Sequence, residues 1–439
     1  MYEILAVIQL VLFLFVIVRY LKKTGIISLV DQGKIMFILW TVAIILYNFK
    51  LSNLYKPTII VNIIVMCISV SFLIMSKYVF LEDVDINKMF LKFTQGKDTY
   101  KIYNTISNLI FTAALIMFSI NVYKYGLAIL EDNKIDKQSL EHFATYVVYM
   151  LVLCGQIKYI LYRNYKKKTD LLLLIGSIVI LVLTLNRGPI AFLIITIGIY
   201  EVFNFVNIKN TLSKKRIHLT YLGFIGMVIL FVCFFGYIGN LRMKFVLENI
   251  YFKTLWEHYG VSEIMPSPIV WVYIYLTSPL ENVAYSLAHQ LLIGNGFFVN
   301  LFYPFIKFGA NTLGKGEALK GWLMSRGRYV PHLQNEVGLS AMSFIPEAFQ
   351  DAGVLGFIVY LAIYLLLAYM SIKVIKNKKL SPMGKVLIYG NIVSILLWSI
   401  FVNSFKIPIV IMNILLVLVI ELLLLTRESW IKPWMKRYL

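Results

Sequence analysis

Long apolar runs, separated by short polar segments, dominate the chain from end to end. Each run is about 15–20 residues long, close to the length that an α-helix needs to cross the hydrocarbon core of a bilayer. Apolar and polar residues do not alternate within the runs, as they do in a transmembrane β-barrel. The pattern predicts an all-α, polytopic integral membrane protein with about eleven transmembrane helices, at residues 4–21, 35–49, 57–76, 102–123, 143–162, 171–185, 190–206, 219–238, 353–372, 386–402 and 407–425.

Positive charge alternates between the segments that connect these runs. Every second connection, together with the C-terminal tail, holds 25 Lys and Arg residues in total, whereas the intervening short connections hold 7. Short loops that are rich in Lys and Arg remain on the cytoplasmic side of a membrane. We therefore expect the N-terminus to lie outside and the C-terminus to lie in the cytoplasm.

One connection is far longer than the others and falls on the predicted outer side. It divides the chain into an N-terminal bundle of about eight spans (1–238), a large outer loop with short helices (239–352), and about three closing spans with a cytoplasmic tail (353–439). Two segments of the loop, 269–276 and 283–308, are apolar and rich in aromatic residues. We expect them to lie along the interface, to enter the membrane as re-entrant pieces, or to form one additional pair of spans.

Composition supports the membrane class and argues against nucleic acid as a partner. Hydrophobic residues make up 60% of the chain, and the formal net charge is +20. A soluble domain is about 45–50% apolar. The positive residues gather in short loops between apolar runs, and no RNA-binding motif, zinc-finger spacing or phosphate loop accompanies them.

One arginine, Arg187, interrupts the apolar sequence between residues 171 and 205. Burying a guanidinium in lipid costs at least a few kcal/mol, and arginine does not lose its proton in proteins. The turn Asn186-Arg187-Gly188-Pro189 joins two predicted spans at the outer side, where Gly188 permits a tight bend and Pro189 suits a first helical turn. Arg187 is therefore either an anion ligand at headgroup depth or a loop arginine that snorkels to lipid headgroups.

The outer loop and its edges hold the residues best suited to an anionic substrate. Arginine binds phosphate through two parallel hydrogen bonds and stays charged in a dry pocket, and an imidazole or a carboxylate can remove a proton from a hydroxyl group. Each residue also fits an ordinary loop role, and the later acids fit a helix N-terminus. The candidates are Arg242, Arg326, Arg328, His332, Glu336, Glu347 and Asp351.

Several polar residues lie inside or near the predicted spans. Lys158 and Glu201 are near cytoplasmic ends, where we expect their side chains to snorkel towards water. Glu421 lies deeper and has no evident partner. Asn62, Asn108, Asn121 and Gln156 are expected to form hydrogen bonds between helices.

Several familiar catalytic patterns are absent from the sequence. It contains no HExxH zinc motif, no GxSxG nucleophile turn and no Walker loop. The outer side also lacks a pair of nearby carboxylates spaced to hold a metal. Phosphate chemistry would therefore require arginines to stabilise the charge of the leaving group, without a metal or another cofactor.

Three short motifs, in this order along the chain, resemble those of a known family. They are Asn186-Arg187-Gly188 at an outer span end, Gly239-x-x-Arg242 at the start of the large loop, and Glu347-Ala-Phe-Gln-Asp-Ala-Gly353-x-x-Gly356 at the entrance to a later span. Together with the outline of ten or more spans and one large outer loop, they resemble the Wzy-type polymerases that join O-antigen or capsular polysaccharide repeat units.

The related O-antigen ligases differ from this chain at one position. They carry a His followed by Asn, Ser or Gln, then nine residues and Gly-x-x-Gly. Here Ser343 and Gly353-x-x-Gly356 have that spacing, but Met342 occupies the histidine position. The departure argues against a ligase and leaves the general base open among His332, Glu336 and Glu347.

The resemblance implies a substrate class and a mechanism. A polymerase of this family is a glycosyltransferase of the bacterial cytoplasmic membrane that works at the outer face. It transfers a growing glycan from undecaprenyl diphosphate onto a new undecaprenyl-diphosphate-linked repeat unit, alongside a flippase and a chain-length regulator. Arg187, Arg242, Arg326 and Arg328 would bind the diphosphate, and aromatic residues would stack on sugars. The candidates for stacking are Trp256, Tyr259 and Trp322.

Two other functions fit a polytopic membrane protein. A flippase for lipid-linked oligosaccharides usually has paired bundles and charges that line a cavity in the middle of the membrane, and this sequence has few charges within its spans. A ligase would transfer the finished glycan to another acceptor. The sequence leaves the sugars, the linkage and the oligomeric state open.

Overall fold

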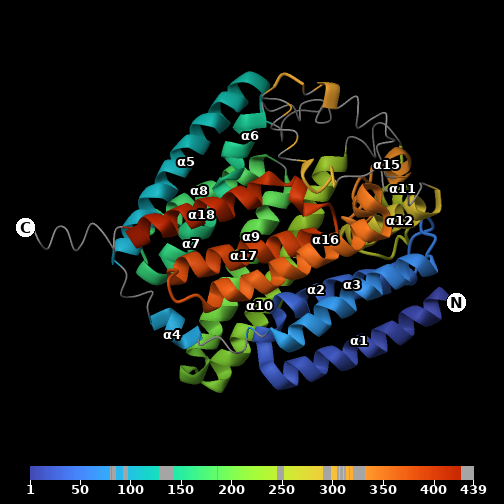
Figure 1. Cartoon of the computed structure of the whole chain (residues 1–439), viewed down its shortest axis with the longest axis horizontal. Coiled ribbons are helices and arrows are strands. Elements are labelled where there is room, and N and C mark those ends of the chain that lie inside the picture. Colours follow the sequence, from blue (N-terminus) through green and yellow to red (C-terminus); the bar gives the residue numbers. More distant parts are fainter. Residues whose placement is uncertain are drawn as a thin grey trace, which may run out of the picture. The chain divides into compact units, whose positions relative to one another are not determined.

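The computed structural model is built from helices, with two isolated β-bridges, Ser52 to Val261 and Ser343 to Val402, among the residues that it describes. These residues are 1–79, 81, 86–91, 97–127, 142–184, 186–244, 252–289, 298–303, 306, 310, 313–315, 317–319 and 332–426. The helices of Figure 1 are α1 (Tyr2–Thr24), η1 (Gly25–Leu29), α2 (Gln32–Asn48), α3 (Ile59–Tyr78), α4 (Ile86–Leu91), α5 (Lys97–Tyr125), α6 (His142–Tyr149), α7 (Leu151–Tyr165), α8 (Lys168–Leu183), α9 (Arg187–Ile208), η3 (Lys209–Thr211), α10 (Lys214–Lys244), α11 (Leu255–Tyr259), α12 (Ser267–His289), α15 (His332–Val337), α16 (Ile345–Lys376), α17 (Pro382–Trp398), η5 (Ser404–Lys406) and α18 (Pro408–Thr426).

Every predicted span coincides with a helix. The run at 143–162 is formed by α6 and α7 together, and each of the other ten runs matches one helix. Among the described residues, eight helical stretches are long and apolar enough to cross a membrane, at residues 2–23, 59–78, 98–125, 144–165, 188–208, 214–241, 345–376 and 409–426. The all-α class is confirmed, and the chain is a membrane-embedded protein; α2 and α17 are shorter apolar helices.

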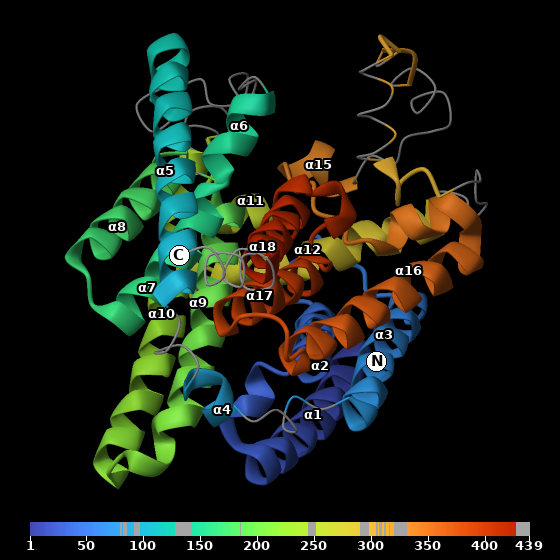
Figure 2. The same cartoon turned by 60° about the vertical axis from the view of Figure 1, so that its left-hand side comes forward.

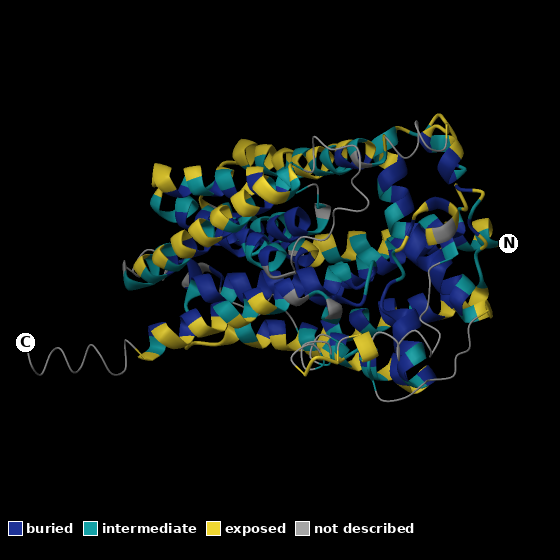
Figure 3. Cartoon of the chain, turned by 90° about the horizontal axis from the view of Figure 1, so that it is seen from above, coloured by how far each residue is buried: buried dark blue, intermediate teal, exposed yellow. Residues whose placement is uncertain are grey.

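The outer helices expose apolar side chains, as lipid-facing helices do. On α1, only 11% of the most apolar window is buried, and Ile4, Val7 and Phe15 are each more than half exposed. Figure 3 shows long exposed stretches along several helices beside a buried interior. Because backbone groups of a helix are satisfied within the helix, such surfaces are compatible with hydrocarbon.

The contacts between residues divide the chain into two compact units. Unit 1 comprises Met1–Phe80, Gly223–Tyr369 and Ile395–Pro408. Its helices α1, α2 and α3 lie side by side, and α12 packs against α2 and α3. A buried amide cluster joins α1, α2 and α3, since Asn48 Nδ2 donates to Asn62 Oδ1 (2.7 Å) and to Gln9 Oε1 (3.0 Å). The predicted bonding of Asn62 between helices is confirmed.

Unit 2 comprises Leu81–Leu222, Met370–Ser394 and Ile409–Leu439. Its helices α5, α7 and α8 lie side by side in Figures 1 and 2. Gln156 of α7 donates to Thr196 Oγ1 (3.0 Å) and accepts from Asn391 Nδ2 (3.0 Å), so α7, α9 and α17 share a buried amide contact. The predicted bonding of Gln156 between helices is also confirmed, whereas Asn108 is exposed and Asn121 Nδ2 is buried with no hydrogen-bond partner among the described residues.

The two units do not follow the predicted division of the chain. The ranges 1–238, 239–352 and 353–439 are consecutive in the sequence, whereas unit 1 combines the first three spans with most of the outer loop. Residues 269–276 and 283–289 of the two apolar loop segments belong to one helix, α12, from Ser267 to His289, and most of its residues from Val270 to Ser286 are buried. The placement of these segments along or within the membrane stays a prediction.

Candidate functional site

Two of the predicted catalytic residues lie one turn apart on α15. His332 Nε2 is 3.1 Å from Glu336 Oε1, and the two side chains are 29% and 48% exposed. A carboxylate only accepts hydrogen bonds, so this pairing favours the tautomer with hydrogen on Nε2 and leaves the Nδ1 lone pair free for a proton. The pair is accessible to a substrate, and its chemistry fits a general base.

An aromatic stack holds the imidazole of His332 against α12. The ring of Tyr285 lies parallel to that of His332, with 4.0 Å between centroids and 5° between planes. Tyr285 also stacks with His289, one turn further along α12, at 4.2 Å. The stack fixes the plane of the His332 ring, which a general base requires for a defined direction of proton transfer.

Asn282 anchors the backbone that follows His332, within α15 and just after it. Its Oδ1 accepts from Leu333 N (3.0 Å), and its Nδ2 donates to Leu339 O (3.1 Å) and Ala341 O (2.7 Å). Leu333 is fully buried, whereas His332 is partly exposed. The short helix α15 is therefore held in place by side chains rather than by its own length, because a six-residue helix is not stable alone.

Glu281, which hydrophobic patterning does not single out, precedes Tyr285 by four residues on α12, and the charge of His332 acts on its carboxylate. It is 4% exposed, and its Oε2 accepts from Tyr47 OH (2.7 Å) and Lys56 N (2.8 Å). α12 is not one of the eight candidate spans. Burial raises the pKa of Glu281, while the hydrogen bonds from Lys56 and Tyr47 and the charge of His332 oppose that rise. One sequence signal was available, since Glu281 is the only acid between residues 267 and 289.

Glu347, the third predicted catalytic residue, belongs to a different polar cluster in unit 1. It is 5% exposed, and its Oε2 accepts from Asn403 Nδ2 (2.9 Å). Asp351, four residues later, accepts from the backbone and side chain of Asn300 (3.0 and 2.9 Å) and from Tyr360 OH (2.7 Å). Both acids therefore connect distant parts of unit 1. Ser343, which has the spacing of the ligase motif, caps the first turn of α16, because its Oγ accepts from Ile345 N.

The Gly353-x-x-Gly356 motif marks a break within α16. Gly353 has φ 60° and ψ −141°, a conformation that is essentially restricted to glycine. A Cβ atom on Gly356 would lie 1.9 Å from Ala348 O, so the chain passes itself too closely for any side chain there. The glycines of this motif are explained by backbone geometry, which positions the Glu347 and Asp351 carboxylates before the long part of the helix.

The Gly239-x-x-Arg242 motif also has a packing role at its first position. A Cβ atom on Gly239 would lie 2.6 Å from the indole of Trp271, and Asn240 Oδ1 accepts from Trp271 Nε1 at 2.6 Å. The glycine therefore allows α10 to approach α12 closely. Arg242 follows in the last turn of α10, and its side chain lies outside the described part of the structure.

The remaining predicted site residues have varied environments. Arg187 begins α9, and Asn186 Oδ1 caps this helix by accepting from Gly188 N (3.3 Å). Gly188 lies in the first turn of α9 and has no positive φ, so Gly188 does not supply the predicted bend. Pro189 lies in the first turn, as predicted. The side chain of Arg187 is not described, and Arg326, Arg328 and Trp322 lie outside the described residues.

Two of the predicted sugar-stacking residues are described, and both belong to unit 1. Trp256 is partly exposed, and its Nε1 donates to Met265 O (2.7 Å). Tyr259 is only 1% exposed and packs edge-on against Trp271. Tyr259 therefore packs within unit 1, and its predicted role in sugar stacking stays a prediction.

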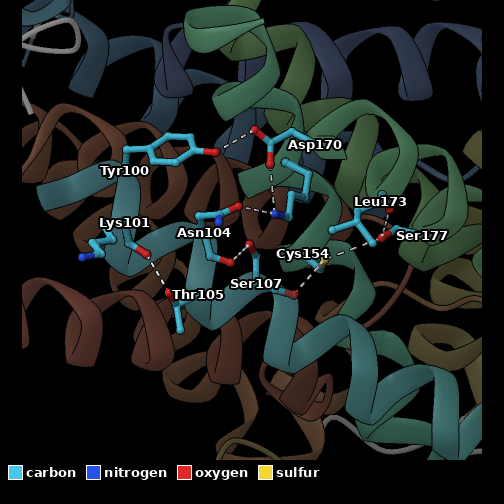
Figure 4. Close-up of polar contacts among 10 residues, drawn as sticks. Tyr100, Lys101, Asn104, Thr105, Ser107, Cys154, Asp170, Leu173 and Ser177 are labelled. Carbon is cyan, nitrogen blue, oxygen red and sulfur yellow. Dashed lines mark hydrogen bonds and ion pairs between the residues drawn. The ribbon is translucent and has the colours of Figure 1, made fainter. Parts of the chain in front are cut away.

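Unit 2 holds a buried carboxylate of its own, Asp170, which is shown in Figure 4. Asp170 Oδ1 accepts from Lys158 Nζ (3.0 Å), and Lys158 also donates to Asn104 Oδ1 (2.6 Å). Tyr100 OH donates to the other oxygen of Asp170 (3.4 Å). Lys158 and Asp170 are 1% and 0% exposed, so the prediction that Lys158 snorkels to water is wrong.

Other polar side chains of unit 2 are paired as well. Glu201 accepts from Arg163 Nε (2.7 Å) and from Tyr159 OH (2.8 Å) and is 16% exposed, which also corrects its predicted snorkelling. Glu421, for which the sequence offered no partner, accepts from Tyr103 OH (2.6 Å) and from Ser381 N (2.7 Å). These pairs connect helices that lie far apart in the sequence.

Fold and side-chain chemistry together define a polytopic helical membrane protein with a partly exposed His–Glu pair in unit 1. Within the described residues, no three His, Cys, Asp or Glu side chains gather in a way that would hold a metal ion. No family model matches the chain, and neither a curated protein nor a solved structure matches it.

Proposed function

We propose that this protein polymerises bacterial surface polysaccharide, either O-antigen or capsule. In the proposed reaction, a glycan on undecaprenyl diphosphate is transferred to a new undecaprenyl-diphosphate-linked repeat unit at the outer face of the cytoplasmic membrane. Three sequence motifs support the proposal, together with the membrane-embedded helices and the many residues of the predicted outer loop that fold into unit 1.

The observation that carries the proposal is the His332–Glu336 pair. An imidazole that is partly exposed, bonded to a carboxylate at 3.1 Å and stacked on Tyr285 has the features of a general base. Of the predicted catalytic residues, Glu347 is already bonded to Asn403 and 95% buried. We therefore assign the base to His332, the orienting role to Glu336 and a structural role to Glu347.

The proposed chemistry balances without a metal. Nδ1 of His332 takes the proton of the acceptor sugar hydroxyl while the hydroxyl oxygen bonds to the anomeric carbon of the donor. The bond from that carbon to the phosphate oxygen breaks, and undecaprenyl diphosphate leaves with the electron pair. The imidazolium then releases its proton to water or to the diphosphate. Guanidinium groups stabilise the charge that develops on the diphosphate.

Arg242 of unit 1 is our first candidate for a diphosphate ligand, with Arg326 and Arg328 as further candidates from the sequence. Arg187 belongs to unit 2 and is tested separately below. Trp256 remains a candidate for sugar stacking because it is partly exposed, and Trp322 remains a candidate from the sequence alone. The proposed partners are the lipid-linked donor and acceptor, a flippase and a chain-length regulator.

Reconstitution tests this proposal against its alternatives. The purified protein in lipid nanodiscs, supplied with a lipid-linked repeat unit, is expected to produce a ladder of longer glycans on the same lipid. In vesicles, relocation of the lipid across the bilayer without lengthening would identify a flippase. Transfer of the glycan to an acceptor that lacks the prenyl diphosphate would identify a ligase. Either of these results without a ladder contradicts the proposal.

A further inference from the structure

The proposed reaction gives no role to the carboxylate of Glu281, although Glu281 belongs to α12, the helix whose Tyr285 stacks on the proposed base His332. Glu281 is 4% exposed and belongs to α12, which packs against α2, α3 and α15. Two hydrogen bonds reach Oε2, from Tyr47 OH and Lys56 N. No hydrogen bond reaches Oε1 from the described residues. A buried carboxylate is costly unless another charge or a reaction step compensates it.

The geometry of α12 directs Glu281 towards His332. Tyr285 follows Glu281 by four residues, so both lie on one face of the helix, and the ring of Tyr285 stacks on His332 at 4.0 Å. Asn282, the next residue, holds the backbone at Leu333. The charge of His332 also acts on the Glu281 carboxylate.

Other titratable groups face this pair from each neighbouring element. Glu336 of α15 bonds His332 from the exposed side, and α12 contributes Tyr285 and His289. Tyr47 OH of α2 and the backbone N–H of Lys56 donate to Glu281, and the charge of Lys56 also acts on this carboxylate. Of the described groups, Glu336 and Glu281 are the negative ones, so His332 has one exposed and one buried carboxylate as neighbours.

We propose that Glu281 is a positioning residue that acts through His332, by holding the imidazolium that forms when His332 takes a proton. This inference rests on the proposed function for its catalytic meaning. Glu336 orients the neutral imidazole, and Glu281 stabilises the charged one from the buried side. A negative charge in a dry environment has a larger effect on a neighbouring cation than an exposed one has.

The substitution Glu281→Gln separates this role from a structural one. Glutamine keeps an acceptor oxygen for Tyr47 OH and Lys56 N but removes the charge. We expect kcat for glycan lengthening to fall about tenfold or more with KM within about twofold, because the interaction is made in the transition state. Thermal unfolding should change little. If Glu281 has only a structural role, kcat will be unchanged in the Glu281→Gln variant. That result would overturn the inference.

A measurement that needs no glycan distinguishes failure of this inference from failure of the proposed function. Neutral imidazole reacts with diethylpyrocarbonate, and peptide mapping reports modification at His332 separately from His258 and His289. At about pH 6.5, near the ordinary pKa of imidazole, we expect His332 in the Glu281→Gln variant to react about twofold faster or more, because the imidazolium has lost its counter-charge.

The matched control is Glu263→Gln, which removes an exposed carboxylate from the same unit and should leave the modification rate at His332 unchanged. An unchanged rate in Glu281→Gln overturns the inference, whatever the protein does to glycans. A faster rate in Glu281→Gln, when the wild-type protein lengthens no glycan, supports the electrostatic effect of Glu281 on His332 and rejects the polymerase proposal instead.

Discussion

Glu281 of unit 1 and Asp170 of unit 2 are both buried carboxylates in helices, but their surroundings differ in kind. Asp170 accepts hydrogen bonds on both oxygens and has a full cationic partner, Lys158, that is itself buried. Glu281 accepts on one oxygen, and its carboxylate experiences the charge of His332, which is 29% exposed. The first arrangement is complete within the protein, whereas the second connects a buried charge to a group that a substrate can reach.

The comparison separates two uses of charge in a membrane protein. The buried Lys158–Asp170 pair, which we call the sealed pair, fixes α7 relative to α8, and neither of its charges is accessible to a ligand. His332 of unit 1, in contrast, is partly exposed and can still accept a proton at Nδ1, because only its Nε2 is paired with Glu336. We therefore place the chemistry with the unit 1 pair and read the Lys158–Asp170 pair as scaffolding of unit 2.

The largest expected effect concerns the sealed pair. Asp170→Leu leaves the Lys158 ammonium buried without its partner, and we expect a loss of about 3–5 kcal/mol in stability. Lys158→Met alone should cost a similar amount. The double variant Lys158→Met/Asp170→Leu should recover most of the loss, because two apolar side chains replace a desolvated pair. Thermal unfolding and the folded yield in detergent measure this. A double variant as unstable as the single variants would contradict the account that the loss comes from an unpaired buried charge.

Arg187 tests whether unit 2 is scaffolding throughout. If its guanidinium binds diphosphate, Arg187→Ala should abolish polymer ladders in cells, a loss of about 10²–10³ in rate or more. Arg187→Lys should retain part of the activity, since lysine keeps the charge but loses the bidentate geometry. Protein levels must match wild type for this comparison. Full activity of the alanine variant would remove Arg187 from the mechanism and would confine the chemistry to unit 1.

The break in α16 tests whether the unit 1 carboxylates depend on backbone geometry. Gly353→Ala places a Cβ atom in a conformation with φ 60°, and we expect about 1–3 kcal/mol of destabilisation. Gly226→Ala in α10 is the matched control, because a Cβ atom there meets nothing within 4 Å. It should be neutral or slightly stabilising, since alanine favours helix. Equal unfolding temperatures for both variants would show that the break is not required.

The smallest expected effect is a pH dependence in the outer-loop part of unit 1. His258 of α11 is 6% exposed, and burial lowers its pKa. The folded state therefore binds fewer protons than the unfolded state, so stability is full above about pH 6.5 and declines as the pH falls below that value. We expect a change below about 1 kcal/mol. His258→Gln retains a donor for Val337 O and should flatten the acid side of the stability profile; an unaltered profile contradicts this account.

The helices were predictable because each apolar run carries its own information. Eleven runs were read from the sequence and eleven helical stretches match them, since a span of lipid-facing helix requires local hydrophobicity and little else. The His332–Glu336 pair was partly predictable too. Both residues were named as candidates, and their separation of four residues brings them together once α15 forms.

The rest depends on contacts between distant parts of the chain. Tyr47 reaches Glu281 across 234 residues, and Tyr103 reaches Glu421 across 318. Hydrophobic patterning does not encode such pairings, so Glu281 was overlooked and Glu421 was left without a partner. Lys158 was misassigned for a different reason. Its partner Asp170 follows by only 12 residues, but the short α7–α8 turn that brings them together was read as a place for snorkelling side chains.

One experiment tests the central claim that His332 of unit 1 takes part in the proposed chemistry and that the buried Lys158–Asp170 pair of unit 2 does not. Four proteins in nanodiscs would be given the same lipid-linked repeat unit: wild type, His332→Ala, Lys158→Met/Asp170→Leu and, as a control, His218→Ala, which removes an exposed histidine from unit 2. We predict glycan lengthening at wild-type rates per folded molecule for the double variant and for His218→Ala. For His332→Ala we predict a loss of about 10²–10⁴-fold. Lengthening by His332→Ala at the wild-type rate, or its loss in the folded double variant, would contradict the account.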